Sequence, residues 1–178
     1  MIETERLLLR GWRASDRDGW AEMGLDPEVM RHFPGLLDRK QSDSMIEEWL
    51  QPHIERNGWG FWAVERKSDA AFLGFTGLAT VNFACPIQHE VEIGWRLARH
   101  AWGHGYAFEA ASAAVEFAFN RLSLDRIVAM TIEANERSRR LMDRLGMVRA
   151  PELDFDHPRV PEDSPMRPHI VYVLERPA

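Results

Sequence analysis

The chain has 178 residues, of which 45% are hydrophobic and 28% are charged. These values are typical of one soluble globular domain, so we expect a single domain over residues 1–178. The formal net charge of −6 argues against a general nucleic-acid-binding protein, which usually carries a basic face. The single cysteine, Cys85, excludes an internal disulfide. Without a secretion signal or an apolar run of about 18 residues, the sequence predicts a cytoplasmic protein that is not in a membrane.

The first half of the chain predicts a strand, two helical stretches and two more strands. Three leucines in residues 6–10 indicate the first strand. Ser42 is a candidate N-cap of the second helix, in which Pro52 predicts a kink or an early end. Two strands are expected at 59–65 and 72–81. Apolar residues with helical spacing predict the buried side of the second helix: Met45, Ile46, Trp49, Leu50 and Ile54.

The second half alternates strands and helices more regularly. A central strand precedes a glycine loop and an alanine-rich helix, and a strand rich in β-branched residues comes next. Asn135 is a favoured N-cap residue for the last helix, and Gly146 is a candidate to end it. Prolines between 150 and 168 predict an ordered loop without regular structure. The expected elements are strands at 89–97, 126–132 and 169–175 and helices at 106–119 and from 135.

The glycine loop is the most informative stretch. Gly103 and Gly105 lie between the central strand and the helix that begins near Tyr106. Glycines at a helix start let backbone N–H groups approach an anion, and the helix terminus adds unpaired donors and partial positive charge. The loop therefore predicts a phosphate-binding site.

The phosphate ligand could belong to a nucleotide or to another cofactor. A dinucleotide fold requires a third glycine for close helix–strand packing, and Phe108 stands at that position. Asp125 has the offset of a ribose-binding acid, but it precedes the next strand, whereas that acid should end it. The Gly-Lys-Ser/Thr of a nucleotide P-loop is missing. A nucleotide-binding α/β domain is thus the weaker interpretation.

Four stretches together resemble the GNAT acyl-CoA N-acyltransferases. Residues 99–107, Arg-His-Ala-Trp-Gly-His-Gly-Tyr-Ala, resemble the family's pyrophosphate loop, with His100 at its Arg/Gln position. Residues 92–97 are similar to the strand before that loop, and residues 135–147 are similar to the helix after the fifth strand. The opening, residues 4–10, resembles the start of the RimJ/RimL-like branch.

The resemblance implies an α+β (mixed) fold. Its central sheet would be mixed, mostly antiparallel and twisted, with about seven strands, about four flanking helices and a splay at the central strand. The implied activity is acetyl transfer from acetyl-CoA to a primary amine by direct attack, with no metal. The positions that the resemblance assigns to the cofactor are Trp95, Leu97, Arg99, Gly103, His104, Gly105, Tyr106, Ala107, Asn135, Ser138 and Arg139.

Alternation along the central strand predicts that Glu90, Glu92, Gly94 and Arg96 share one face. Taken alone, this face could be solvated, with Arg96 as a local salt partner. The resemblance favours Glu92 as the base that takes the amine proton, directly or through water, with Glu90 as the alternative. Ser138 is the candidate acid for the leaving thiolate. The family's usual tyrosine acid is missing, because its region reads Leu-Met-Asp.

Several alternatives stay open in the sequence. A non-catalytic acyl-CoA-binding sensor would keep the same loop. His100 and His104 lack a third metal ligand at suitable spacing, and Cys85 has no paired base, so it is expected to be a small buried residue. The acceptor could be a small molecule or a protein N-terminus, and a homodimer is plausible by analogy. Three further residues could either contact the acceptor or simply cap turns: Asp154, Asp156 and His157.

Overall fold

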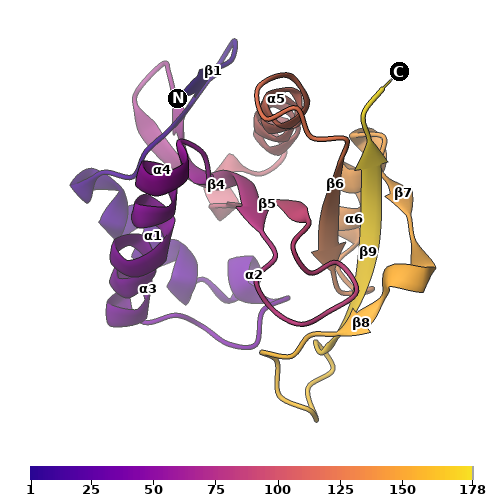
Figure 1. Ribbon diagram of the computed structural model, residues 1–178. Coiled ribbons are helices and arrows are strands. Elements are labelled where there is room, and N and C mark those ends of the chain that lie inside the picture. Colours follow the sequence, from indigo (N-terminus) through magenta and orange to yellow (C-terminus); the bar gives the residue numbers. More distant parts are fainter. Residues whose placement is uncertain (178) are drawn as a thin grey trace.

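The computed structural model describes residues 1–177, which form one nine-stranded sheet with helices on both faces (Figure 1). The strand order is β1-β2-β3-β4-β5-β6-β9-β7, and β8 pairs with β9. All pairs are antiparallel except β5 with β6, which confirms the expected mixed sheet. The strands are β1 (Ile2–Glu3), β2 (Leu7–Arg10), β3 (Phe61–Arg66), β4 (Ala71–Thr80), β5 (Val91–Leu97), β6 (Arg126–Thr131), β7 (Val148–Arg149), β8 (Phe155–Asp156) and β9 (Pro168–Glu175).

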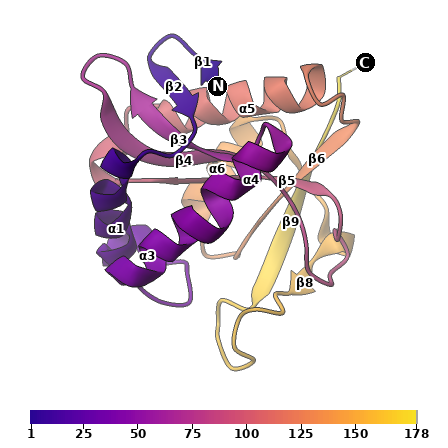
Figure 2. The ribbon, with the colours of Figure 1, turned by 60° about the vertical axis from the view of Figure 1, so that its left-hand side comes forward.

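The helices divide between the two faces of the sheet. In Figure 2, α5 runs along one side of the strands and the α3–α4 segment crosses the other. No helix of residues 1–177 combines the length and apolar composition that a membrane span requires. The α-helices are α1 (Arg17–Leu25), α2 (Pro27–Met30), α3 (Arg39–Met45), α4 (Gln51–Asn57), α5 (Tyr106–Asn120) and α6 (Glu136–Arg144), and a π-helical turn, η2 (Ile46–Leu50), joins α3 to α4.

The main core lies between the sheet and α5. Alanines 110, 111, 114 and 118 are fully covered, and these small side chains let the helix lie close to the strands. Strands β2 to β6 contribute alternate residues, among them Leu78 and Ile93. This face of the sheet is therefore filled by α5 and α6, as the alanine-rich sequence predicts.

Two separate clusters cover the opposite face. Helices α1 to α4 bury aromatic residues of β3 and β4, including Phe61 and Phe75. Loop residues 81–87 and the segment near β8 cover Val128 and Val171 on β6 and β9. Strand β5 runs between these clusters, and its residues on this face are Glu92, Gly94 and Arg96.

The sheet is splayed between β5 and β6. Strand β5 pairs with β4 along its whole length, but it pairs with β6 only at Glu92↔Val128. In contrast, β6 and β9 pair at six successive positions, from Arg126 to Thr131. Beyond Glu92, the edge of β5 that faces β6 therefore has backbone groups without a neighbouring strand, which confirms the predicted splay.

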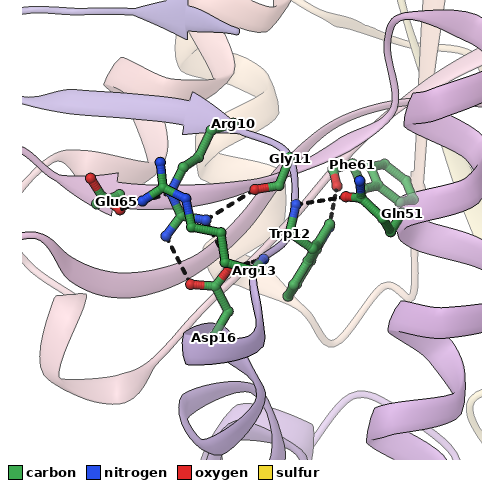
Figure 3. A network of polar contacts seen from close by, with 8 residues as sticks. All are labelled: Arg10, Gly11, Trp12, Arg13, Asp16, Gln51, Phe61 and Glu65. Atoms are coloured by element: carbon green, nitrogen blue, oxygen red, sulfur yellow. Dashed lines mark hydrogen bonds and ion pairs between the residues drawn. The ribbon is translucent and has the colours of Figure 1, made fainter.

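A buried network of charges joins β2, β3 and the start of α1 (Figure 3). Arg10 is 4% exposed and donates to the carboxylates of Asp16, at 2.7 and 2.8 Å, and Glu65, at 2.7 Å. Arg13 completes the network with a contact of 3.0 Å to Glu65. The two arginines balance the two acids, so the buried charges are paired and hydrogen-bonded.

Three local predictions were wrong. Ser42 is buried inside α3, and the N-cap is Asp38, whose side chain accepts from the amide of Gln41. Trp49 is 38% exposed, because it lies in the π-helical turn, which changes the helical phase. The segment after Ala150 was expected to lack regular structure, yet Phe155–Asp156 forms β8 against β9.

Candidate active site

The glycine loop connects β5 to α5 as the sequence predicts. Gly103 and Gly105 have φ values of +80° and +81°, a left-handed conformation that favours glycine. The carbonyl of His104 points toward Arg6, whose Nη1 donates to it at 3.1 Å. Gly105 then caps the 15-residue helix α5. These dihedrals turn the chain directly from the strand into the helix.

The loop amides form a natural anion cradle. Within residues 1–177, the N–H groups of Gly103, His104 and Gly105 donate no hydrogen bond. The first turn of α5, which begins with Tyr106 and Ala107, adds unpaired donors and the positive end of a helix dipole. An added Cβ at Gly103 would meet nothing within 4 Å, so the loop is open beside these amides. The arrangement suits a pyrophosphate.

Glu92 lies on the face of β5 opposite α5, between the two smaller clusters. Burial raises its pKa to about 7, while the positive charge of Arg159 acts in the opposite direction. Among residues 1–177, no ion pair engages its carboxylate. A carboxylate that titrates near neutral pH and is free to accept a proton has the properties of a general base.

Glu90, the alternative base, is held by an ion pair. Arg126 contacts its two carboxylate oxygens at 2.5 and 3.1 Å. The pairing satisfies the carboxylate and crosses from the start of β5 to the start of β6. This geometry favours Glu92 over Glu90 as the proton acceptor.

Trp95 and Ser138 bridge the two arms of the splay. The indole Nε1 of Trp95 on β5 donates to Ser138 Oγ on α6 at 3.3 Å. Asn135 caps α6 as predicted, because its side chain accepts from the Ser138 amide. Its Nδ2 also donates to Thr131 Oγ1, at 3.0 Å, on β6. The structure thus brings together three residues that the family resemblance assigns to the cofactor.

The remaining predicted cofactor residues have other partners. The carbonyl of Leu97 accepts from the indole of Trp102 at 2.9 Å. Arg99 pairs with Asp26 at 3.3 Å, and Arg139 pairs with Glu133 at 2.6 Å. Tyr106 is buried in the main core with Arg6 over its ring. The guanidinium groups of Arg99 and Arg139 are therefore already engaged by acidic partners.

Two arginines near the site have contacts that the sequence did not indicate. Arg159, in the proline-rich segment, donates to Asn82 at 2.7 Å and is close enough to Glu92 to lower its pKa. Arg96 is packed among aromatic rings and is not the expected salt partner of the glutamates. Neither set of contacts follows from local sequence, because both depend on segments distant along the chain.

Other candidate residues gain no reactive environment. Burial and the neighbouring Glu92 raise the pKa of the Cys85 thiol, which disfavours the thiolate that a nucleophile needs. Residues 1–177 contain no group of three His, Cys, Asp or Glu side chains arranged for a metal ion. Asp154 pairs with Arg149 and accepts from the Val171 amide, so it has a structural role. The ring of His157 packs at a tilt against those of Phe83 and His169, with centroid separations of 4.6 and 4.8 Å.

Sequence comparisons give the same family over most of the chain. Residues 6–148 match the model of the acetyltransferase (GNAT) domain. The Bacillus subtilis protein YkkB is 34% identical over 149 residues, which cover 82% of this chain and 84% of YkkB. The uncharacterized N-acetyltransferase YoaA of the same organism is 29% identical, with 82% and 81% of the two chains covered.

Solved structures share the fold. An acetyltransferase from Agrobacterium tumefaciens has a TM-score of 0.78 at 24% identity, covering 98% of this chain and 94% of its own. Spermidine N-acetyltransferase from Vibrio cholerae, solved with CoA and spermine, has a TM-score of 0.73 at 16% identity, with 97% and 96% covered. The chain therefore belongs to the GNAT family of acetyltransferases, whose co-substrate is acetyl-CoA.

Proposed function

We propose that Glu92 deprotonates the acceptor amine in this acetyl-CoA-dependent N-acetyltransferase. The observation that carries the proposal is an unpaired carboxylate with a pKa of about 7, located where the sheet splays. Near neutral pH, about half of the molecules would hold Glu92 ionised. A base of this pKa can take a proton from an ammonium group and leave a neutral amine to attack.

The residues present fit acetyl-CoA. The amides of Gly103, His104 and Gly105 and the start of α5 would hold the pyrophosphate, and the free edge of β5 near Trp95 would pair with the pantetheine arm. Bound there, acetyl-CoA supplies an activated acyl group and a thiolate leaving group. The protein would then align the amine, accept a proton from it and donate a proton to the thiolate.

Ser138 is our proposed acid for the thiolate. An indole N–H can only donate, so in the contact with Trp95 the Ser138 oxygen must be the acceptor. The hydroxyl proton of Ser138 is therefore free to point toward a leaving group. The chain has two tyrosines, Tyr106 and Tyr172, and both are buried in the core. A serine acid is compatible with this, because neither tyrosine takes that place.

The opening stretch, residues 4–10, supports a place in the RimJ/RimL-like branch, and the acceptor would be a small amine or a protein N-terminus. The single cysteine supports work in the reducing cytoplasm. A non-catalytic acyl-CoA sensor needs the loop but not a base of neutral pKa, so Glu92 favours the enzyme.

Two measurements test the proposal. Thermal unfolding with acetyl-CoA, NADH or ATP should show stabilisation by acetyl-CoA alone, since a ligand at about 100 times its Kd adds roughly 2.7 kcal/mol. Glu92→Gln should then retain that stabilisation while losing on the order of 10² or more of kcat with an amine acceptor. Glu90→Gln is the matched control. Equal activity of Glu92→Gln and the unaltered protein would refute the base assignment.

A further inference from the structure

The guanidinium of Arg96 lies among three aromatic rings. Its Cζ is 3.9 Å from the ring centroid of Phe33, 5.2 Å from that of Trp20 and 5.7 Å from that of Phe75. We call these three residues the aromatic box. Phe33 follows α2, Trp20 belongs to α1 and Phe75 to β4, so separate elements converge on this one cation.

The cation in the aromatic box has no anionic partner. Its Nε and Nη1 atoms are buried without a hydrogen bond, and no ion pair among residues 1–177 includes it. Burial alone lowers its pKa to about 10, and no carboxylate is close enough to oppose that shift. Cation–π contacts recover only part of the cost of desolvating a charge. An unpaired buried cation therefore destabilises the fold, and Arg96 has no acidic partner although the chain carries 28 acidic residues.

Arg96 shares a strand face with Glu92. The two residues are four positions apart on β5, so their Cα atoms are separated by roughly 13 Å along the strand. Gly94, between them, has no side chain, and the ring of Phe61 approaches the position where its Cβ would be, at 3.1 Å. This face thus presents a carboxylate, an apolar centre and a cation in line. Although two nitrogens of its guanidinium are buried, the Arg96 side chain is partly exposed.

Further positive charge lies near the aromatic box. Arg137 of α6 lies over the ring of Trp102, at 4.2 Å, and takes part in no ion pair among residues 1–177. Arg137 and Arg31 both lower the pKa of His32, next to the aromatic box, although burial is the larger cause. Arg31 is paired with Glu28 at 3.6 Å, so Arg137 adds the unpaired positive charge on this side of the site.

We propose that Arg96 binds an anionic group of the acceptor, a carboxylate or phosphate several bonds away from the amine that Glu92 deprotonates. The acceptor class is then an amine that also carries an anion, and polyamines are disfavoured because their second cation would meet Arg96. This inference rests on the proposed function of Glu92. It goes further by naming the charge of the substrate.

The phosphates of acetyl-CoA are the other possible source of an anion. Arg96 contacts residues of α1 and β4 in the cluster opposite α5, whereas the loop amides belong to the start of α5. The geometry therefore favours the acceptor, and acetyl-CoA affinity distinguishes the two sources. An Arg96 variant should bind acetyl-CoA with a Kd within about twofold of the unaltered protein.

The experiment measures CoA release with ω-amino carboxylates of two to eight carbons, each beside the n-alkylamine and the diamine of equal length. At the preferred length, kcat/KM should be at least tenfold higher for the amino carboxylate. Arg96→Met should raise the KM for that acceptor at least tenfold, with a much smaller change for the alkylamine, and Arg96→Lys should restore part of the preference. Arg121→Met, an exposed arginine at the end of α5, is the matched control.

The outcomes separate the two proposals. Equal use of amino carboxylates, alkylamines and diamines at every length would overturn the role of Arg96 and leave Glu92 as the base. Weaker acetyl-CoA binding in Arg96→Met, with unchanged acceptor KM, would assign Arg96 to the co-substrate and also overturn the inference. If acetyl-CoA binds but no amine is acetylated, the proposed function itself fails. Acceptor selectivity of the unaltered protein needs no variant, so misfolding cannot obscure the result.

Discussion

Trp95 and Ser138 connect the two arms of the splayed sheet through one hydrogen bond of 3.3 Å. Trp95 belongs to β5, and Ser138 belongs to α6, which follows β6. The bond fixes the Ser138 oxygen as an acceptor and leaves its proton available. It therefore relates the width of the splay to the orientation of the proposed acid.

Replacing Ser138 by alanine tests this acid role. We expect kcat to fall on the order of 10²-fold, because the thiolate would leave without a proton donor, while the Kd of acetyl-CoA changes little. Trp95→Phe removes the indole donor while keeping an aromatic ring, and it serves as a control with a smaller loss. Rates with acyl donors whose thiols are more acidic should recover in Ser138→Ala. A uniform loss with all donors would point to a structural role.

The pKa of Glu92 predicts the pH dependence of catalysis. Because the base acts when ionised, kcat/KM should rise with pH and reach half its maximum near pH 7, where Glu92 titrates. The profile of Glu92→Gln should lack this rising limb, the part in which kcat/KM increases with pH. A rate profile whose limb persists in Glu92→Gln would mean that another group titrates there.

Arg159 should move that limb. Its charge lowers the pKa of Glu92, so Arg159→Met is expected to raise that pKa and to shift the half-maximal pH upward. Arg159→Lys keeps the charge and should shift the limb less. The measurement is kcat/KM between pH 5 and 9 for the three proteins. If the limb moved downward, the field of Arg159 at Glu92 would not be the controlling effect.

The same pKa affects stability. Folding raises the pKa of Glu92 from 4.5 to about 7, so the folded state holds this proton more tightly than the unfolded chain. Glu92 therefore destabilises the fold increasingly as the pH rises from about 4.5 to 7, and the penalty is complete above that range. Glu92→Gln should raise the Tm relative to the unaltered protein at pH 8 and much less at pH 5. Equal differences at both pH values would exclude a buried titrating carboxylate.

Much of the site could be predicted because its signals are local. Glycines at a helix start, an asparagine before α6 and period-2 alternation in β5 depend on a few neighbouring residues, and the structure confirms the loop, the cap and the shared face of Glu92 and Arg96. The splay and the role of Glu92 came from the family resemblance, because no residue pattern alone indicates them.

The contacts that set the chemistry could not be predicted, because they join distant segments. Glu90 pairs with Arg126, which is 36 positions away, rather than with Arg96 on its own strand. Trp49 fits helical spacing, but the π-helical turn rotates it outward. Packing partners are decided by topology, and a single sequence does not state which loop covers which strand face.

The network around Arg10 gives the last prediction, on stability. Arg10→Met would leave the buried carboxylates of Asp16 and Glu65 close together, with only the more exposed Arg13 to balance them. Breaking a buried pair by removing one partner costs about 3–5 kcal/mol, so urea unfolding should show a loss of that size. Arg17→Met, which removes more exposed pairs with Glu47 and Asp43, should cost clearly less. Similar losses for the two variants would show that the charges of the Arg10 network are not desolvated. In that case the network could not be what holds α1, and with it Trp20, in place against Arg96.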